Sequence, residues 1–136
     1  MVTVSSERDT IDLDAVVSYL QNDSYWATER SREDIEASMD NSLCFSVLLD
    51  GEFVGFARIV TDQITFNYLC DFFVLPEHQN QGIGSEALRL IMDDDRLARG
   101  MWILFTRTAH DFYRRFGFGQ SEGFFSRVMV RHRPGS

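Results

Sequence analysis

Apolar residues upstream of residue 43 recur with the spacing of a helix face. In the segment 13–20 they occupy positions 13, 16, 17 and 20, so one side of a helix there is apolar throughout. Ser31 followed by Asp34 resembles a helix start, and Ile35 and Met39 then fall on one side of the turns that follow. The pattern therefore predicts two helices in the first part of the chain.

The hydrophobic period changes at residue 43 to that of β-strands. Short apolar runs are separated by turn-forming residues such as Asp50-Gly51, and the last run stops at Pro76. This arrangement predicts an antiparallel meander. The predicted strands cover residues 43–49, 53–60 and 64–75.

Helical spacing returns after a loop that contains two glycines. Ala87, Leu88, Ile91 and Met92 form one apolar face, and the next apolar run, 101–106, has the character of a buried strand. Because a helix separates this strand from the preceding one, the two strands are expected to be parallel neighbours in one sheet.

The patterns in the C-terminal part of the chain are shorter. The segment HDFYRRFGF predicts a helix that begins at His110 and ends at Gly117, and residues 118–120 and 126–131 are predicted to form a small hairpin. Together the elements indicate an α+β fold with a mixed, mostly antiparallel sheet flanked by helices. The length of 136 residues indicates a single domain over residues 1–136.

Composition and charge restrict the function. The formal net charge of −8 argues against nucleic-acid binding, which normally requires a basic face. Cys44 and Cys70 each lie in an apolar run and are predicted to be core residues rather than a disulfide or metal ligands. Because His78, His110 and His132 are scattered along the chain, no metal site is indicated.

The sequence also gives no indication of a membrane protein. No apolar stretch reaches the length of a membrane span, and the N-terminal segment lacks a basic start followed by a long apolar run. We therefore predict a cytoplasmic location without membrane association.

Residues 76–88, PEHQNQGIGSEAL, place two glycines at the start of the third helix. Glycines leave backbone N–H groups accessible, and a first helical turn adds unpaired N–H groups and a partial positive charge. This arrangement suits a pyrophosphate, although glycine pairs also serve as plain turns or packing devices. A Walker loop is excluded because no lysine follows Gly84, and a dinucleotide motif because Gly82 lies well beyond the strand end.

Two motifs resemble the GNAT superfamily of N-acetyltransferases. The segment QNQGIG at 79–84 matches the family's acyl-coenzyme A motif, Gln/Arg-x-x-Gly-x-Gly/Ala, with Gln79 where arginine is commoner. The segment FYRRFGF at 112–118 resembles a second motif, a tyrosine on a short helix followed by Gly-Phe. The order of predicted elements is also that of the family, so the resemblance covers nearly the whole chain.

The resemblance implies that acetyl-CoA binds in a splayed gap between the strands at 64–75 and 101–106. Backbone groups near Phe73 and Val74 would pair with the pantetheine arm, and the amides of residues 81–85 would hold the pyrophosphate. His110 would either contact the cofactor or cap its helix. The implied cofactor-binding residues are Phe73, Val74, Gln79, Asn80, Gln81, Gly82, Ile83, Gly84, Ser85 and His110.

The resemblance implies a catalytic role for Tyr113, and the residues themselves suggest one for Asp71. Tyr113 would be the general acid that protonates the departing thiolate, and the alternative is that its ring packs with Phe112 and Phe116. Asp71, the carboxylate within the run 64–75, is the candidate general base. A structural aspartate that holds a loop, or a water chain that takes the proton instead, are the alternatives for Asp71.

Tyr25 and Trp26 lie between the first two helices, where the family places acceptor contacts, so they are candidates for acceptor binding or for buried packing. The implied function is transfer of an acetyl group from acetyl-CoA to a primary amine of a small molecule or peptide. The alternatives are a non-catalytic acyl-CoA-binding sensor or regulatory module, and an interaction domain without a ligand. Dimers are common in the family, and the short C-terminal hairpin would leave the acceptor side open or completed by a second subunit, so a homodimer is compatible with the sequence.

Overall fold

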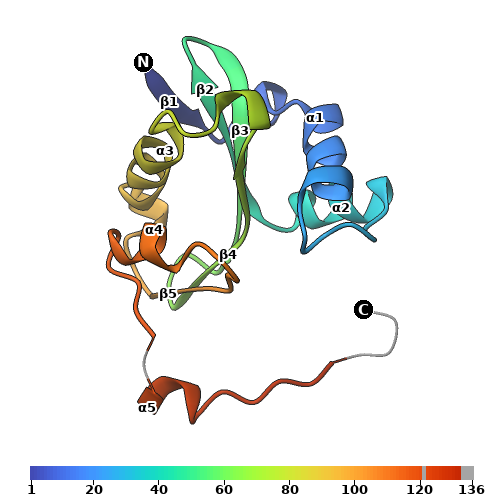
Figure 1. The fold of residues 1–136 in the computed structure, drawn as a ribbon. Helices are drawn as coiled ribbons and strands as arrows, with labels where there is room; N and C mark the ends of the chain where they lie inside the picture. The colour runs from blue at the N-terminus through green and yellow to red at the C-terminus, as the bar shows by residue number, and fades with distance from the viewer. Residues whose placement is uncertain (121, 133–136) are drawn as a thin grey trace. The chain divides into compact units, whose positions relative to one another are not determined.

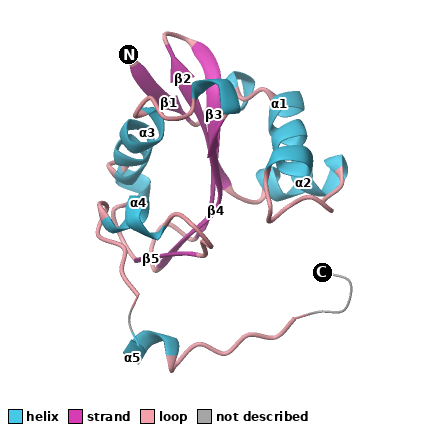
Figure 2. Ribbon diagram, viewed as in Figure 1, coloured by secondary structure: helices cyan, strands magenta, loops and turns pink. Residues whose placement is uncertain are grey.

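The computed structural model describes residues 1–120 and 122–132. The chain divides into two compact units, Met1–Phe105 and Thr106–Ser136. The first unit is built on a five-stranded sheet with the strand order β1-β2-β3-β4-β5 (Figures 1 and 2). The strands are β1 (Val2–Ser5), β2 (Leu43–Leu49), β3 (Glu52–Thr61), β4 (Phe66–Val74) and β5 (Met101–Leu104).

The strand pairing confirms the predicted meander. Strands β2, β3 and β4 pair antiparallel in sequence order, and β5 lies parallel to β4, as expected across an intervening helix. Strand β1 was not predicted, and it pairs antiparallel with β2 at the edge of the sheet. Its sequence, VTVS, is short but rich in β-branched residues, which suit an edge strand that is only partly buried.

Helices α1 (Leu13–Ser18) and α2 (Arg32–Asp40) begin where polar side chains can accept their unpaired N–H groups. Asp12 accepts from the backbone of Ala15 at the start of α1, and Ser31 accepts from Asp34 at the start of α2. The helical elements are α1 (Leu13–Ser18), a π-helical turn η2 (Tyr19–Asp23), α2 (Arg32–Asp40) and α3 (Ile83–Met92), with short 3-10 turns at η1 (Arg8–Thr10), η3 (Pro76–His78) and η4 (Asp95–Leu97).

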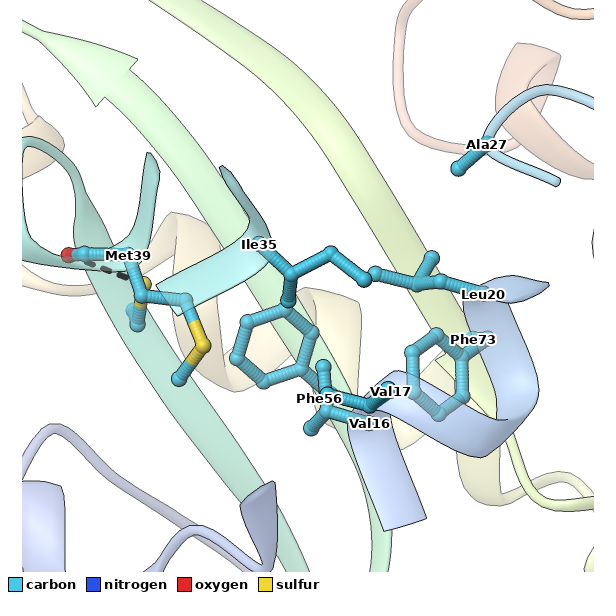
Figure 3. Packing of buried hydrophobic residues seen from close by; sticks show 9 residues of the cluster. Val16, Val17, Leu20, Ala27, Ile35, Met39, Phe56 and Phe73 are labelled. Atoms are coloured by element: carbon cyan, nitrogen blue, oxygen red, sulfur yellow. Dashed lines mark hydrogen bonds between the residues drawn. The ribbon is translucent and has the colours of Figure 1, made fainter. Parts of the chain in front are cut away.

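The sheet has apolar clusters on both faces. On one face, residues of α1, η2 and α2 pack over Phe56 of β3 and Phe73 of β4 (Figure 3). Each of these fully or nearly fully buried phenylalanines contributes about 1.5–3 kcal/mol of hydrophobic stabilisation. On the other face, Ile83 and Ala87 of α3 pack against Val47 and Val54. Helices therefore cover both faces of the sheet, with α1 and α2 opposite α3 (Figure 1).

The second unit is small. It contains α4 (His110–Arg114), which was predicted, and α5 (Glu122–Phe125). The predicted C-terminal hairpin is wrong, since neither 118–120 nor 126–131 forms a strand. The apolar side chains of the second segment are largely exposed, including Met129 at 96%. Two strands this short need an apolar surface to pack on before their pairing is stable.

Candidate functional site

Only the first part of β4 is paired with β5. The pairs run from Phe66↔Met101 to Leu69↔Leu104, whereas β4 continues to Val74. At this same point the register between β3 and β4 shifts, because Arg58 pairs with Asp71 and Ile59 with Leu69. Cys70 is therefore the extra residue of a β-bulge.

A β-bulge bends its strand and interrupts pairing, which explains why the β4–β5 ladder ends beside Cys70. The segment 71–74 of β4 is hydrogen-bonded to β3 on one side, and β5 supplies no pairing residue on the other. This segment lies within the strand that was predicted to border the splayed gap.

The glycine loop follows β4 and leads into α3. Asn80 and Gly82 both have left-handed backbone conformations, with φ of 64° and 79°, and Gly82 is the N-cap residue of α3. No side chain caps this helix, and its first intrahelical bond runs from the N–H of Glu86 to the carbonyl of Gly82. A Cβ at Gly82 would have no heavy atom within 4 Å, so the space in front of the helix start is open.

These features make the start of α3 suitable for an anion. The N–H groups of a first helical turn have no intrahelical acceptors, and the helix dipole places a partial positive charge there. Residues 79–82 are exposed, so their backbone is accessible to a ligand. Backbone groups of this kind bind phosphate without basic side chains, which is consistent with the net charge of −8.

Gln79 holds the glycine loop against the end of β4. Its side-chain Nε2 donates to the carbonyl oxygen of Val74 at 2.9 Å. The Phe73 ring is buried and stacked on the Tyr19 ring, with centroids 3.9 Å apart. The structure thus brings Gln79 to the carbonyl of Val74, whereas Phe73 is enclosed in the apolar cluster and its contact with the cofactor stays a prediction.

Asp71 is at the centre of a buried ion-pair group on the sheet face covered by α1 and α2. Its Oδ2 accepts from Arg58 Nε at 2.7 Å, and both oxygens accept from Arg30 Nη1 at 3.0 Å. Trp26 Nε1 donates to Oδ1 at 2.6 Å. Arg58 also donates to the Ser42 hydroxyl at 3.1 Å. Because Asp71 is 1% exposed, these bonds replace almost all of its hydration.

The contacts of Asp71 bear on its expected role. Both oxygens of this carboxylate already accept hydrogen bonds from guanidinium or indole N–H groups, and the side chain is buried, so an incoming amine has little access to them. The geometry therefore favours the structural alternative for Asp71, while its role as general base stays a prediction. Burial lowers the pKa of Arg58, but the charge of Asp71 and the hydrogen bond to it outweigh burial and raise this pKa above its ordinary value.

Tyr68 and Cys70 face the same group of charges. Burial raises the pKa of both side chains, and each is also influenced by Arg58, Asp71 and Arg30. Both cysteines are free thiols, and burial raises the pKa of Cys44 to about 12. The position of Cys44 in the apolar cluster confirms that it is a core residue, whereas Cys70 is half-buried at the bulge.

The two aromatic candidates for acceptor binding differ in exposure. Tyr25 is 44% exposed, and its ring contacts Trp26 edge-on at 5.1 Å. Trp26 packs against the apolar cluster under α1 and α2 and donates to Asp71. Trp26 is therefore partly a packing residue, and Tyr25 lies at the surface beside it.

Tyr113 and His110 belong to the second unit. The Tyr113 ring contacts Phe112 at 5.0 Å and Phe118 at 5.8 Å, both edge-on, and its role as general acid stays a prediction. The N-cap residue of α4 is Ala109 and no side chain caps this helix. His110 therefore does not have the expected capping role, and cofactor contact stays a prediction for it.

Sequence reasoning missed Arg30, Arg58 and the bulge at Cys70. Arg58 had a signal, because a single charged residue interrupts the apolar strand FVGFARIV just as Asp71 interrupts the next strand. Opposite charges in facing strands often pair. Arg30 and the bulge had no comparable signal, since a loop arginine and an apolar run fit many arrangements.

Metal and membrane sites are not seen in the part of the chain that the structure describes. Across residues 1–120 and 122–132, no three His, Cys, Asp or Glu side chains are grouped as metal ligands would be. Within the same residues, every helix is too short or too polar to cross a lipid bilayer.

Comparisons with known proteins identify the family. Residues 13–118 match the sequence profile described as the Acetyltransferase (GNAT) family. A crystal structure from Xanthomonas campestris pv. campestris, assigned to this family, is 34% identical with a TM-score of 0.90 and covers 99% of this chain and 95% of its own. A candidate acetyltransferase of Gibberella zeae is 28% identical in an alignment 107 residues long, which covers 65% of this chain and 60% of that relative's length.

A GNAT family acetyltransferase from Brucella melitensis, crystallised with acetyl-CoA, shares the fold at a TM-score of 0.69. It is 22% identical, and the alignment covers 88% of this chain and 84% of that one. The sequence profile spans most of the present chain, and the Xanthomonas structure matches nearly all of it. The chain therefore belongs to the GNAT family of acetyltransferases.

Proposed function

We propose that this protein transfers an acetyl group from acetyl-CoA to a primary amine. The observation that carries the proposal is the uncapped start of α3 at Gly82, with open space around the position of its missing Cβ, in the loop that follows the part of β4 beyond its last pair with β5. The acetyl-CoA bound to the Brucella melitensis relative, a protein with the same fold, supports this choice of cosubstrate.

The residues present fit acetyl-CoA. The N–H groups of residues 81–85 would hold the diphosphate, and the hydrogen bond from Gln79 to Val74 ties the loop to the end of β4. Segment 71–74 of β4 lies beyond the last pair with β5, and the amides of the pantetheine arm would add to it as a further strand. Bound acetyl-CoA would supply a thioester whose carbonyl carbon is open to attack by an amine.

The chain then has two proton transfers to assist. An alkylammonium with a pKa of ~10.4 must lose a proton before its nitrogen attacks, which costs about 4 kcal/mol near pH 7.4. As the new C–N bond forms and the C–S bond breaks, Tyr113 would donate its phenolic proton to the departing sulfur. The base is either Asp71 or a water chain, and the two arginines that hold Asp71 favour the water chain.

Coenzyme A binding tests the carrying observation. In a thermal-unfolding assay, CoA at 100 times its dissociation constant should add about 2.7 kcal/mol of stability. Gly82→Ala should weaken this binding at least ~10-fold, because a Cβ would enter the open space and force a non-glycine residue into a left-handed conformation.

Gly51→Ala is the matched control. Gly51 lies in the β2–β3 turn with φ of 86° and likewise has no heavy atom near its would-be Cβ, so its variant carries the same strain away from the loop. Its CoA binding should equal that of the wild type. If CoA gave no shift in the wild type, and no amine in a broad panel released free thiol from acetyl-CoA, the proposed function would be wrong.

A further inference from the structure

The ion-pair group around Asp71 has more positive than negative charge. Two arginines, Arg30 and Arg58, share this single carboxylate. The other side-chain ion pairs among the described residues give each arginine an acid of its own, such as Arg8 with Asp40. A surplus positive charge is therefore held beside the bulge of a protein whose net charge is −8.

Arg30 carries this surplus. Arg58 is largely buried, with 10% side-chain exposure, and its Nε pairs with Asp71, so the aspartate chiefly neutralises Arg58. Arg30 is 33% exposed and reaches Asp71 through Nη1 alone. Within residues 1–105, all of which the structure describes, its Nε and Nη2 donate to no other residue.

The backbone around Arg30 is fixed in place. Its carbonyl oxygen accepts from Gln21 Nε2 at 2.9 Å, and its N–H donates to the carbonyl of Ala27 at 3.1 Å. With Nη1 held on both oxygens of Asp71, the guanidinium plane is oriented before any ligand arrives. A pre-oriented guanidinium loses little conformational entropy when it binds, and its planar fork matches a carboxylate in two parallel hydrogen bonds.

The group also lies where an acceptor is required. Asp71 and Cys70 adjoin the point where β4 leaves β5, and Trp26 and Tyr25, in the segment between η2 and α2, lie on the sheet face that Asp71 occupies. Helix α3, whose start is assigned to the diphosphate, covers the opposite face. An acceptor would therefore reach the thioester from the side of Arg30.

We propose that Arg30 binds a carboxylate of the acceptor, so that the substrate is a primary amine which also carries a carboxylate: a free amino acid or the C-terminal end of a short peptide. This inference rests on the proposed acetyl transfer. One surplus positive charge matches one carboxylate, whereas a phosphate with a charge of about −2 would remain incompletely neutralised.

Matched acceptors test the proposal. The turnover assay measures thiol release from acetyl-CoA with amino acids and dipeptides, each beside its C-terminal amide. The chain contains no lysine, so self-acetylation of lysine side chains adds no background. Arg30→Ala should lower kcat/KM for the carboxylate forms by about 10- to 100-fold, mainly through KM, as expected for loss of a charged hydrogen bond.

With the amide acceptors, Arg30→Ala should change kcat/KM by less than about twofold, which is the size expected for an ordinary surface substitution. Arg30→Lys should restore part of the kcat/KM that is lost with the carboxylate acceptors. For each acceptor, kcat/KM of the variant is divided by kcat/KM of the wild type. Because both values come from the same amine, differences in basicity between acceptors cancel. Arg32→Ala removes the same charge two residues away, where Arg32 pairs with Asp14 at the surface, and should leave both acceptor classes unchanged.

A binding assay separates this proposal from the proposed function. N-acetyl amino acids, which are the expected products, should raise the melting temperature more than their amides do, and Arg30→Ala should abolish the difference. Equal use of acids and amides by the wild type, with CoA binding intact, would overturn the carboxylate site and leave acetyl transfer standing. Preferential binding of N-acetyl acids without any turnover would support the carboxylate site and count against acetyl transfer. A comparison of kcat/KM for free amino acids with kcat/KM for dipeptides shows whether the carboxylate belongs to an amino acid or to the C-terminal end of a peptide.

Discussion

Replacing Asp71 by asparagine should strongly destabilise the protein. The substitution keeps the shape of the side chain but removes the charge that neutralises Arg58, whose side chain is 10% exposed. Breaking a buried ion pair by removing one partner typically costs about 3–5 kcal/mol, because the remaining charge stays buried and unpaired. Arg30 adds little to this cost, since its 33% exposure allows water to screen its charge.

A loss of that size is a large share of the total stability of about 5–15 kcal/mol that a domain normally has. With a urea dependence of about 2 kcal/mol per molar, the unfolding midpoint should fall by about 1.5–2.5 M. Tryptophan fluorescence reports the transition directly, because the Trp26 indole donates to Asp71. The apo protein should be used, so that bound CoA does not add to the measured stability.

Two further variants make the result specific. Asp40→Asn removes a carboxylate from the exposed pair with Arg8 and should cost no more than about 1 kcal/mol. The double variant Arg58→Met/Asp71→Leu removes both buried charges, and it should regain much of the stability lost by Asp71→Asn. If Asp71→Asn stayed within about 1 kcal/mol of the wild type, or if the double variant were no better than the single one, the reasoning from the buried pair would be refuted.

The same variant also addresses catalysis. If Asp71→Asn retains the wild-type dependence of kcat/KM on pH in acetyl transfer, Asp71 is not the general base. A profile that loses its acidic limb would restore Asp71 as the base, despite the arginines that surround it.

Two other substitutions have clear expected outcomes. Tyr113→Phe keeps the ring contacts with Phe112 and Phe118 but should slow turnover by about 10²-fold with unchanged CoA affinity; near-normal turnover would assign Tyr113 to packing alone. The pKa of Asp62 is lowered, chiefly by the Thr65 hydroxyl and also by backbone N–H groups in the turn, so its stabilising effect is present above the unfolded pKa of ~3.9 and is lost as the pH falls towards the lower folded value. Asp62→Asn should therefore lower the urea midpoint at pH 7, with a difference from wild type that shrinks below about pH 4, and a constant difference would contradict this assignment.

Much of the first unit could be predicted from hydrophobic periodicity. Helix α3 and strands β2 to β4 follow their predicted positions within a few residues because each has a buried face that fixes its period. Strand β1 was missed because four residues are too few to establish an alternation. The predicted hairpin at 118–131 was wrong because local β propensity does not supply the apolar surface that two short strands require.

One part of the candidate site could likewise be predicted from the sequence, and another part could not. The glycine loop could be predicted because its residues are contiguous, and their backbone conformation follows from Gly82 itself. The ion-pair group could not, since its members at 26, 30, 58 and 71 meet only through the register of β3 with β4 and the path of the loop before α2. Periodicity describes one segment at a time and contains no information on such encounters.

The bulge at Cys70 also has a consequence for how such a protein changes over time. The proposed pairing of the pantetheine arm with β4 depends on one extra residue, Cys70. Without it, β3 and β4 would run in continuous register. Deleting a single codon would move every β4 side chain before that point to the opposite face. Loss of this strand end and loss of the fold would thus be the same mutational event, so a descendant without the proposed activity is expected to retain the bulge.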